Sequence, residues 1–157
     1  MQYLKTHYGR AIPVIPSETV DIPNPANAGL SSSTTDVASA NQLTDTSVTF
    51  TTNLIGNIII ANGGISTVVG FVDSNTLILA DDIGSELGIS YTLYVSTPNE
   101  GCSIYIPAQT PDKITVVTLT GDIVLLHNCG DLNAHTILPI QVKRIFPNNL
   151  TNLVALW

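Results

Sequence analysis

The chain has 157 residues, of which 44% are hydrophobic and only 11% are charged, and its net charge is −7. This length fits one compact domain or two very small ones. The charged fraction is well below the roughly 25% that is usual for a soluble domain, so the surface owes its polarity to Thr, Ser and Asn or is covered by partners. No apolar run approaches the roughly 20 residues of a membrane-spanning helix, and the first residues form no sustained apolar leader, so neither a membrane contact nor a secretory signal is expected.

The negative charge is confined to the middle of the chain. No Lys or Arg occurs between Arg10 and Lys113, whereas residues 30–100 contain seven acids. The remaining residues hold five acids and five bases, so the whole net charge belongs to this middle segment. Phosphates need a basic face, which argues against nucleic acid as a partner. The distribution would suit a near-neutral part that docks and an acidic part that faces solvent.

The first 29 residues are rich in proline. Proline fixes φ and lacks an N–H donor, so this segment is predicted to be an extended arm or an edge strand rather than a helix. The small polar residues 29–41 follow, and they are predicted to be a linker or an exposed loop.

Short β-branched segments then alternate with turn residues. Asn62-Gly63 is a strong hairpin signal, because both residues tolerate positive φ. The only helical turn expected lies within residues 47–54. Many short strands separated by turns are typical of a sandwich or barrel. The predicted strands are 57–61, 65–72, 76–80, 89–95, 102–106, 113–119, 122–127 and 137–146.

The chain closes on an apolar run that ends at Trp157. Burial of a large apolar side chain contributes about 1.5–3 kcal/mol, so a terminal Trp on such a run is expected to be docked. The last strand is therefore predicted to belong to the core or to a subunit contact.

The densest group of potential metal ligands is His127, Cys129 and His135. Zinc accepts these residue types, but their spacing matches no established site and a fourth ligand is missing. The acidic loop 81–86 could hold calcium, but the twelve-residue pattern of a calcium loop is absent. Ordinary turns are the simpler interpretation, and no metal or other cofactor is expected.

No catalytic site is recognisable in the sequence. A Ser-His-Asp triad could be dispersed along the chain, but the GxSxG elbow is absent and there are only three His residues. The prediction is a protein that is not an enzyme and has no catalytic residues. A small hydrolase using His127 or His135 is the alternative.

Three further features have both a structural and a functional interpretation. Cys102 and Cys129 are two buried thiols, a disulfide or metal ligands. Lys143-Arg144 protects an edge strand or forms a salt bridge across a subunit contact. The aromatic residues Tyr91, Tyr94 and Phe71 pack in a core or form a sugar-binding face.

Both ends of the chain carry a family pattern. Leu138-Pro139, Val142-Lys143-Arg144 and Val154-Ala155-Leu156-Trp157 match its closing strands, and residues 21–26 match its Asp-Leu-Pro-x-Pro segment. These segments resemble the spike base proteins, which are small virion proteins of tailed phages and phage-like gene transfer agents. Pro147-Asn148-Asn149 departs from the family, which has a glycine-rich turn there.

In that family the first segment runs almost directly into a strand like residues 102–106, whereas about seventy residues intervene here. The intervening residues resemble a second pattern, common in phage structural proteins. It is carried by Leu43, Asp45, Phe50, Gly56, Val69, Val72, Ser74, Thr76, Leu77, Asp82, Ile83, Tyr91 and Tyr94. Insertion at an exposed loop would explain why the net charge is confined to this segment.

We therefore expect an all-β chain of two parts. Residues 1–29 and 101–157 would form a small antiparallel sandwich or barrel with an extended N-terminal arm. Residues 30–100 would form an inserted acidic β module.

The resemblance implies a structural protein of the phage virion, assembled in the host cytoplasm as a homo-oligomer. Its place would be at the head, as a decoration or cement protein, or at a vertex, as a spike base. Its partners would be the major capsid protein or vertex or tail proteins. A tail or collar component and a carbohydrate-binding adhesin module are the alternatives. The candidate interface residues are Pro13, Pro16, Pro23, Pro25, Lys143, Arg144, Ile145, Phe146 and Trp157.

Overall fold

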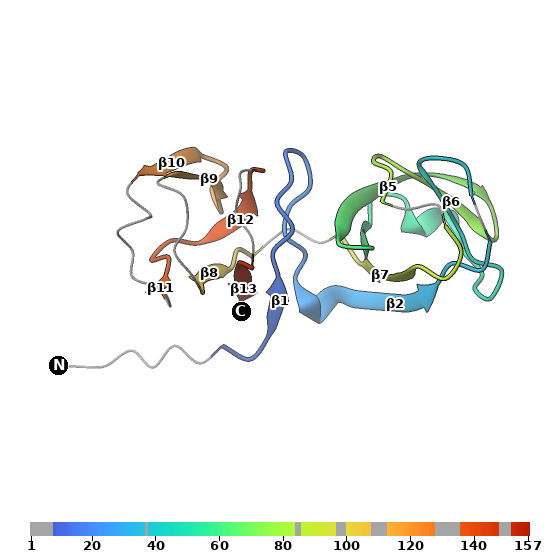
Figure 1. Cartoon of the computed structure of the whole chain (residues 1–157), viewed down its shortest axis with the longest axis horizontal. Helices are drawn as coiled ribbons and strands as arrows, with labels where there is room; N and C mark the ends of the chain where they lie inside the picture. The colour runs from blue at the N-terminus through green and yellow to red at the C-terminus, as the bar shows by residue number, and fades with distance from the viewer. Residues whose placement is uncertain are drawn as a thin grey trace. The chain divides into compact units, whose positions relative to one another are not determined.

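The computed structural model describes residues 8–36, 38–83, 86–96, 100–107, 113–127, 136–147 and 152–157. Within these residues all regular structure is β-strand apart from two single 3-10 turns, and the strands form three antiparallel sheets (Figure 1). The predicted all-β class is confirmed.

The chain divides into two compact units. The terminal unit comprises Met1–Pro25 and Asn99–Trp157, and the inserted unit is Ala26–Pro98. These limits lie close to residues 30 and 100, where the sequence analysis placed them.

The terminal unit is built from two antiparallel sheets. One has the order β1 (Ala11–Pro13), β13 (Val154–Leu156), β8 (Ser103–Ile106) and β11 (Thr136–Ile137). The other has the order β10 (Ile123–His127), β9 (Lys113–Thr118) and β12 (Val142–Ile145).

The core of the terminal unit consists of buried aliphatic residues from both sheets. Period-two alternation buries Ile104 and Ile106 of β8, and likewise Ile114 and Val116 of β9. A bridge between Cys102 and Val142 joins the segment before β8 to β12. The two sheets therefore enclose one continuous core, as a sandwich requires.

The inserted unit is one six-stranded antiparallel sheet with its own core. Its strand order is β2 (Ala28–Ser33), β7 (Ser90–Tyr94), β4 (Ile58–Ala61), β5 (Gly64–Asp73), β6 (Thr76–Leu79) and β3 (Gln42–Thr44). The sheet curls around buried residues that include Phe50, Ile59 and Leu77 (Figure 1). Near its two edge strands Thr35 N donates to Thr44 O at 3.1 Å, but the sheet does not close into a barrel.

The predicted hairpin at Asn62-Gly63 is confirmed. The φ angles are 49° at Asn62 and 74° at Gly63, and the register pairs Ala61 with Gly64 across the turn. A two-residue loop with both central φ angles positive matches the right-handed twist of its flanking strands.

Two local predictions were wrong, and a third holds only in part. Residues 29–41 were expected to be a loop, but β2 occupies Ala28–Ser33. The predicted strand 137–146 is broken into β11 and β12, which belong to different sheets, because Pro139 between them has no N–H to donate. The helical turn expected at 47–54 is reduced to η2 (Thr52–Leu54), while η1 (Pro25–Asn27) lies just before β2.

Hydrogen bonds bring the ends of each unit together where the chain crosses between units. In the terminal unit, Ile22 N donates to Lys143 O and Cys102 N donates to Val142 O, each at 2.8 Å. In the inserted unit, Val95 N donates to Asn27 O at 2.8 Å. Adjacent ends are the geometry that lets one domain be inserted into another.

Candidate functional site

The described part of the N-terminal arm packs along its own unit. Val14 N donates to Leu153 O at 2.9 Å, and Ser17 N donates to Ile145 O at 2.9 Å. Ile22 is 3% exposed and belongs to the core. Residues 8–25 therefore do not form a free arm that could reach a neighbouring subunit, and residues 1–7 lie outside the described part.

The four prolines of the arm differ in exposure. Pro13 is exposed at the end of β1, Pro16 and Pro25 are half-buried, and Pro23 is buried. Pro23 is therefore unavailable as an interface residue, because its ring is enclosed by its own unit.

Arg144 forms a salt bridge inside its own chain. Its Nε donates to Asp21 Oδ1 at 2.7 Å, and its Nη1 donates to Glu18 O at 2.7 Å. The ion pair that Arg144 forms in this structure is therefore within its own chain. The guanidinium instead fastens the N-terminal segment to β12 by two charge-assisted bonds. Lys143, the other half of this pair, lies half-buried beside it.

The apolar interface candidates at the end of the chain are mostly part of the core. Ile145 is 1% exposed, so its side chain cannot meet a partner. Phe146 and Trp157 are half-buried, and Trp157 packs against the terminal core. Trp157 N donates to Arg10 O at 3.0 Å, which docks the last residue as expected. Its indole Nε1 is buried without a hydrogen-bond partner among the described residues.

Tyr91 belongs to a buried polar cluster rather than to a sugar-binding face. It is 3% exposed, and its hydroxyl donates to Asp45 Oδ2 at 2.8 Å. The side chain of Asp45 is fully buried and also accepts from Ser47 N at 2.9 Å and from the Ser47 hydroxyl. Burial and the adjacent Asp45 raise the pKa of Tyr91. Of the two interpretations of these aromatic residues, core packing therefore holds for Tyr91. Phe71 is half-buried and packs against the same core.

The pKa of Asp45 reflects two opposed effects. Burial disfavours the carboxylate and would raise its pKa, but hydrogen bonds from Ser32, Ser47 and Tyr91 outweigh this and lower it. The cluster therefore holds a buried anion whose oxygens accept hydrogen bonds from its neighbours.

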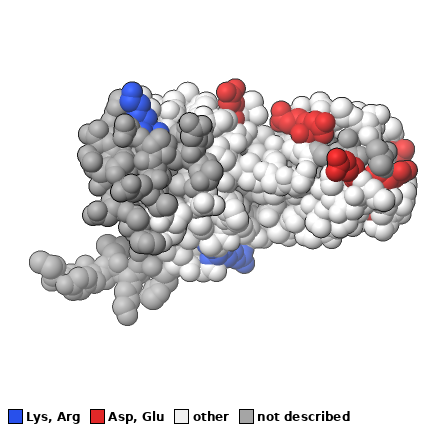
Figure 2. Space-filling view, in the orientation of Figure 1, with Lys and Arg blue, Asp and Glu red and all other residues white. Residues whose placement is uncertain are grey.

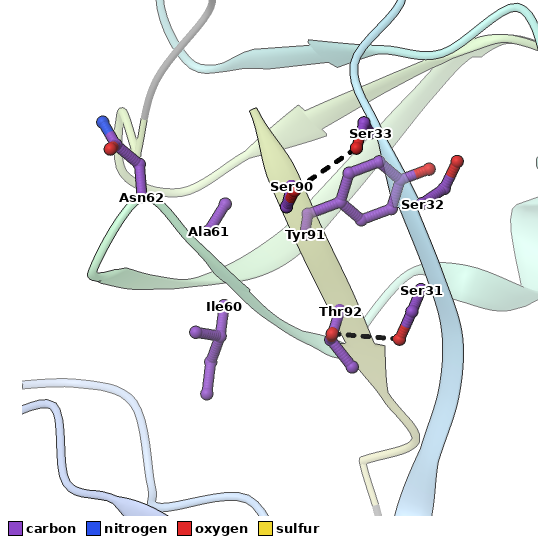
Figure 3. Close-up of a pocket in the computed structure, with 9 residues that line it drawn as sticks. All are labelled: Ser31, Ser32, Ser33, Ile60, Ala61, Asn62, Ser90, Tyr91 and Thr92. Carbon is purple, nitrogen blue, oxygen red and sulfur yellow. Dashed lines mark hydrogen bonds between the residues drawn. The ribbon is translucent and has the colours of Figure 1, made fainter. Parts of the chain in front are cut away.

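A shallow groove of about 470 Å³ lies on the opposite, outer face of the inserted sheet, across β2, β7 and β4 (Figure 3). Four of its hydroxyls pair with each other: Ser31 with Thr92 at 3.0 Å and Ser33 with Ser90 at 3.3 Å. Tyr91, whose hydroxyl donates to Asp45, also lines the groove. None of the residues that line it is charged. The groove offers neutral polar contacts and holds no arrangement of a nucleophile and a base.

Cys102 has a free, buried thiol, so the disulfide interpretation is wrong for it. Its Sγ donates to Val142 O at 3.2 Å, and burial raises its pKa to about 12. Such a thiol is unreactive at neutral pH. Cys129 and His135 lie outside the described residues, as does the rest of the 128–135 turn. No group of three potential metal ligands occurs in the described part of the chain.

The charges divide between the units as the sequence requires. On the face shown in Figure 2 the described residues of the inserted unit present acidic side chains and no Lys or Arg. Every Lys and Arg belongs to the terminal unit, since none occurs from residue 11 to residue 112. Among the described helices none could cross a membrane.

Sequence reasoning predicted the strand at residues 122–127 but missed that its apolar side chains are the most exposed ones on the described strands of the terminal unit. Ile123 is 67% exposed and Leu125 is 47% exposed, both on β10, and Leu119 in the preceding turn is 41% exposed. The sequence signal was present, because residues 123–126 are Ile-Val-Leu-Leu. Alternate side chains of a strand point to opposite faces, so a strand with apolar residues at every position and only one buried face leaves some of them exposed to water.

Comparisons of the chain with protein-family models, with curated proteins and with solved structures gave no match.

Proposed function

We propose that this chain is a structural protein of a tailed-phage virion, placed at the head surface or a vertex as a decoration, cement or spike-base protein. The observation that carries the proposal concerns the two segments that resemble spike base proteins. Asp21 and Ile22 of the first segment contact Arg144 and Lys143 of the second, through a salt bridge and a backbone hydrogen bond. The two segments thus form one continuous patch of a single unit.

The charge distribution supports the same role. The terminal unit contains six acids and five bases and is nearly neutral, whereas the six charged residues of the inserted unit are all acids. A near-neutral surface can lie against identical or viral neighbours without electrostatic repulsion, and an acidic surface favours solvent. Contacts that are individually weak become strong when symmetry repeats them over a particle.

The proposal is tested on virions of the phage that encodes the chain. The purified protein, added to particles that lack it, should co-sediment with them at a fixed copy number, and a cryo-electron map should show its density at the head or a vertex. A matched variant replaces residues 26–98 by a short glycine linker, which the adjacent ends of the terminal unit permit. This variant should still bind, because the terminal unit docks. The proposal would be refuted if the particles bound neither protein and if mass spectrometry found no trace of the chain in purified virions.

A further inference from the structure

The edge strands of the two sheets of the terminal unit differ in how they are protected from pairing with another chain. β1 has three residues and ends at Pro13, and β11 has two residues and is followed by Pro139. β12 carries a bulge and is covered by the segment from Ser17 to Ile22. Short strands, prolines, bulges and covering segments are the usual devices that blunt a sheet edge.

β10 has none of these devices within its described residues. Its five residues pair in unbroken register with β9 on one side, and no described strand pairs on the other (Figure 1). Residues 123–127 contain no proline, Lys or Arg. An apolar edge strand of this kind is a template for another strand.

The backbone of β10 alternates between its neighbour and the open edge. Thr118 N donates to Asp122 O at 2.9 Å, so Asp122 forms a hydrogen-bonded pair with β9. In an antiparallel ladder the hydrogen-bonded pairs alternate, so the amides of Val124 and Leu126 face β9. The N–H and C=O groups of Ile123 and Leu125 consequently face the open edge.

We infer that β10 is a self-association edge, on which β10 of a second copy of this chain adds as an antiparallel strand across a two-fold axis. In the register centred on Val124, Ile123 of each copy lies opposite Leu125 of the other. The two most exposed side chains of the strand then become cross-strand neighbours, and four backbone hydrogen bonds form between the copies. A two-fold contact requires such a self-complementary surface.

Charge complementarity selects a second copy in antiparallel orientation as the occupant. Asp122 lies at the turn end of the β9–β10 hairpin, and Lys113 begins β9 at the other end. In antiparallel addition the turn end of one hairpin, with Asp122, lies beside the open end of the other hairpin, with Lys113. In parallel addition the two turn ends would lie side by side, and the two Asp122 residues would repel each other. This contact would be one of the contacts of the assembly role proposed above, and in that respect it rests on that role.

Sedimentation equilibrium and hydrogen exchange on the full chain test the inference. The wild type should form a concentration-dependent dimer, and Leu125→Lys should raise its dissociation constant roughly tenfold or more, because a charge replaces an apolar cross-strand contact at two symmetric sites. Val69→Lys is the matched control, since Val69 is 52% exposed on a strand of the inserted unit. It should leave the dimer unchanged.

Hydrogen exchange keeps the inference testable if Leu125→Lys does not fold. In the wild type the amides of Ile123 and Leu125 should exchange rapidly in dilute solution and become protected as the concentration rises. The inference would be overturned by any of three results: the wild type is monomeric, the dimer leaves the amides of Ile123 and Leu125 unprotected, or only Val69→Lys weakens the dimer. A monomer that still co-sediments with particles would overturn the dimer edge alone, which separates it from the proposed function.

Discussion

At the scale of single residues, the least expected feature is the fully buried carboxylate of Asp45. A buried charge is costly unless it is hydrogen-bonded, and Tyr91 and Ser47 supply the bonds. Asp45 follows β3 and Tyr91 belongs to β7, so the cluster ties together two strands that are not neighbours in the sheet. The cluster therefore helps to fix how the sheet curls, in addition to stabilising it.

Asp45→Asn should lower the free energy of unfolding by about 1.5–3 kcal/mol at pH 7, because bonds to a charged acceptor are lost. The folded state lowers the pKa of Asp45, so its contribution is complete above the unfolded pKa near 4 and is lost as the pH falls through the folded value. Urea unfolding should show the difference between wild type and variant shrinking below about pH 4. Asp73→Asn is the control, because Asp73 is exposed and its bond to Asn75 N can be made by an amide. A difference that grows on acidification would contradict the account.

At the scale of elements, β13 is the strand on which the terminal unit depends most. It pairs with β1 on one side and with β8 on the other, so a three-residue strand organises most of one sheet. Ala155 of this strand and Leu153 just before it are buried in the core. Sequence reasoning identified this strand from its apolar run and expected it in the core or at a subunit contact; its place in the core is confirmed.

Deleting Leu156 and Trp157 should destabilise the terminal unit by about 3 kcal/mol or more, since apolar burial and the pairing of Leu156 with Ala11 and Ser103 are lost together. Thermal unfolding of the full chain followed by calorimetry measures this. The control is Leu87→Ala, because Leu87 is 66% exposed and lies in the inserted unit. Wild-type stability after the deletion would show that β13 is dispensable.

At the scale of the whole molecule, the chain is two independent cores on one polypeptide. Each core consists of buried residues of its own unit, and the ends of the inserted unit meet at the Asn27–Val95 hydrogen bond. A module of this size can fold alone when its core is intact, since many domains of about 60 residues do so.

The excised fragment 26–98 should therefore fold on its own. We expect a β-type circular dichroism spectrum and a cooperative thermal transition that Asp45→Asn lowers as it does in the full chain. The fragment carrying Ile59→Ala is the control, because loss of a fully buried side chain costs about 2–5 kcal/mol and should abolish or strongly lower the transition. A random-coil spectrum for the unsubstituted fragment would show that the inserted unit depends on the rest of the chain.

The sequence by itself determined the β class, most strands and the Asn62-Gly63 hairpin, because period-two alternation and positive-φ turn residues are local signals. It did not reveal β2, because a run of Ser has little strand propensity until Ser31 and Ser33 pair with hydroxyls of β7. Only the tertiary structure decided that Arg144 pairs within its own chain, that Ile145 and Tyr91 are core, and that β10 is an exposed edge. Each of these depends on which segments far apart in sequence become neighbours, and alternation along a single strand carries no information about that.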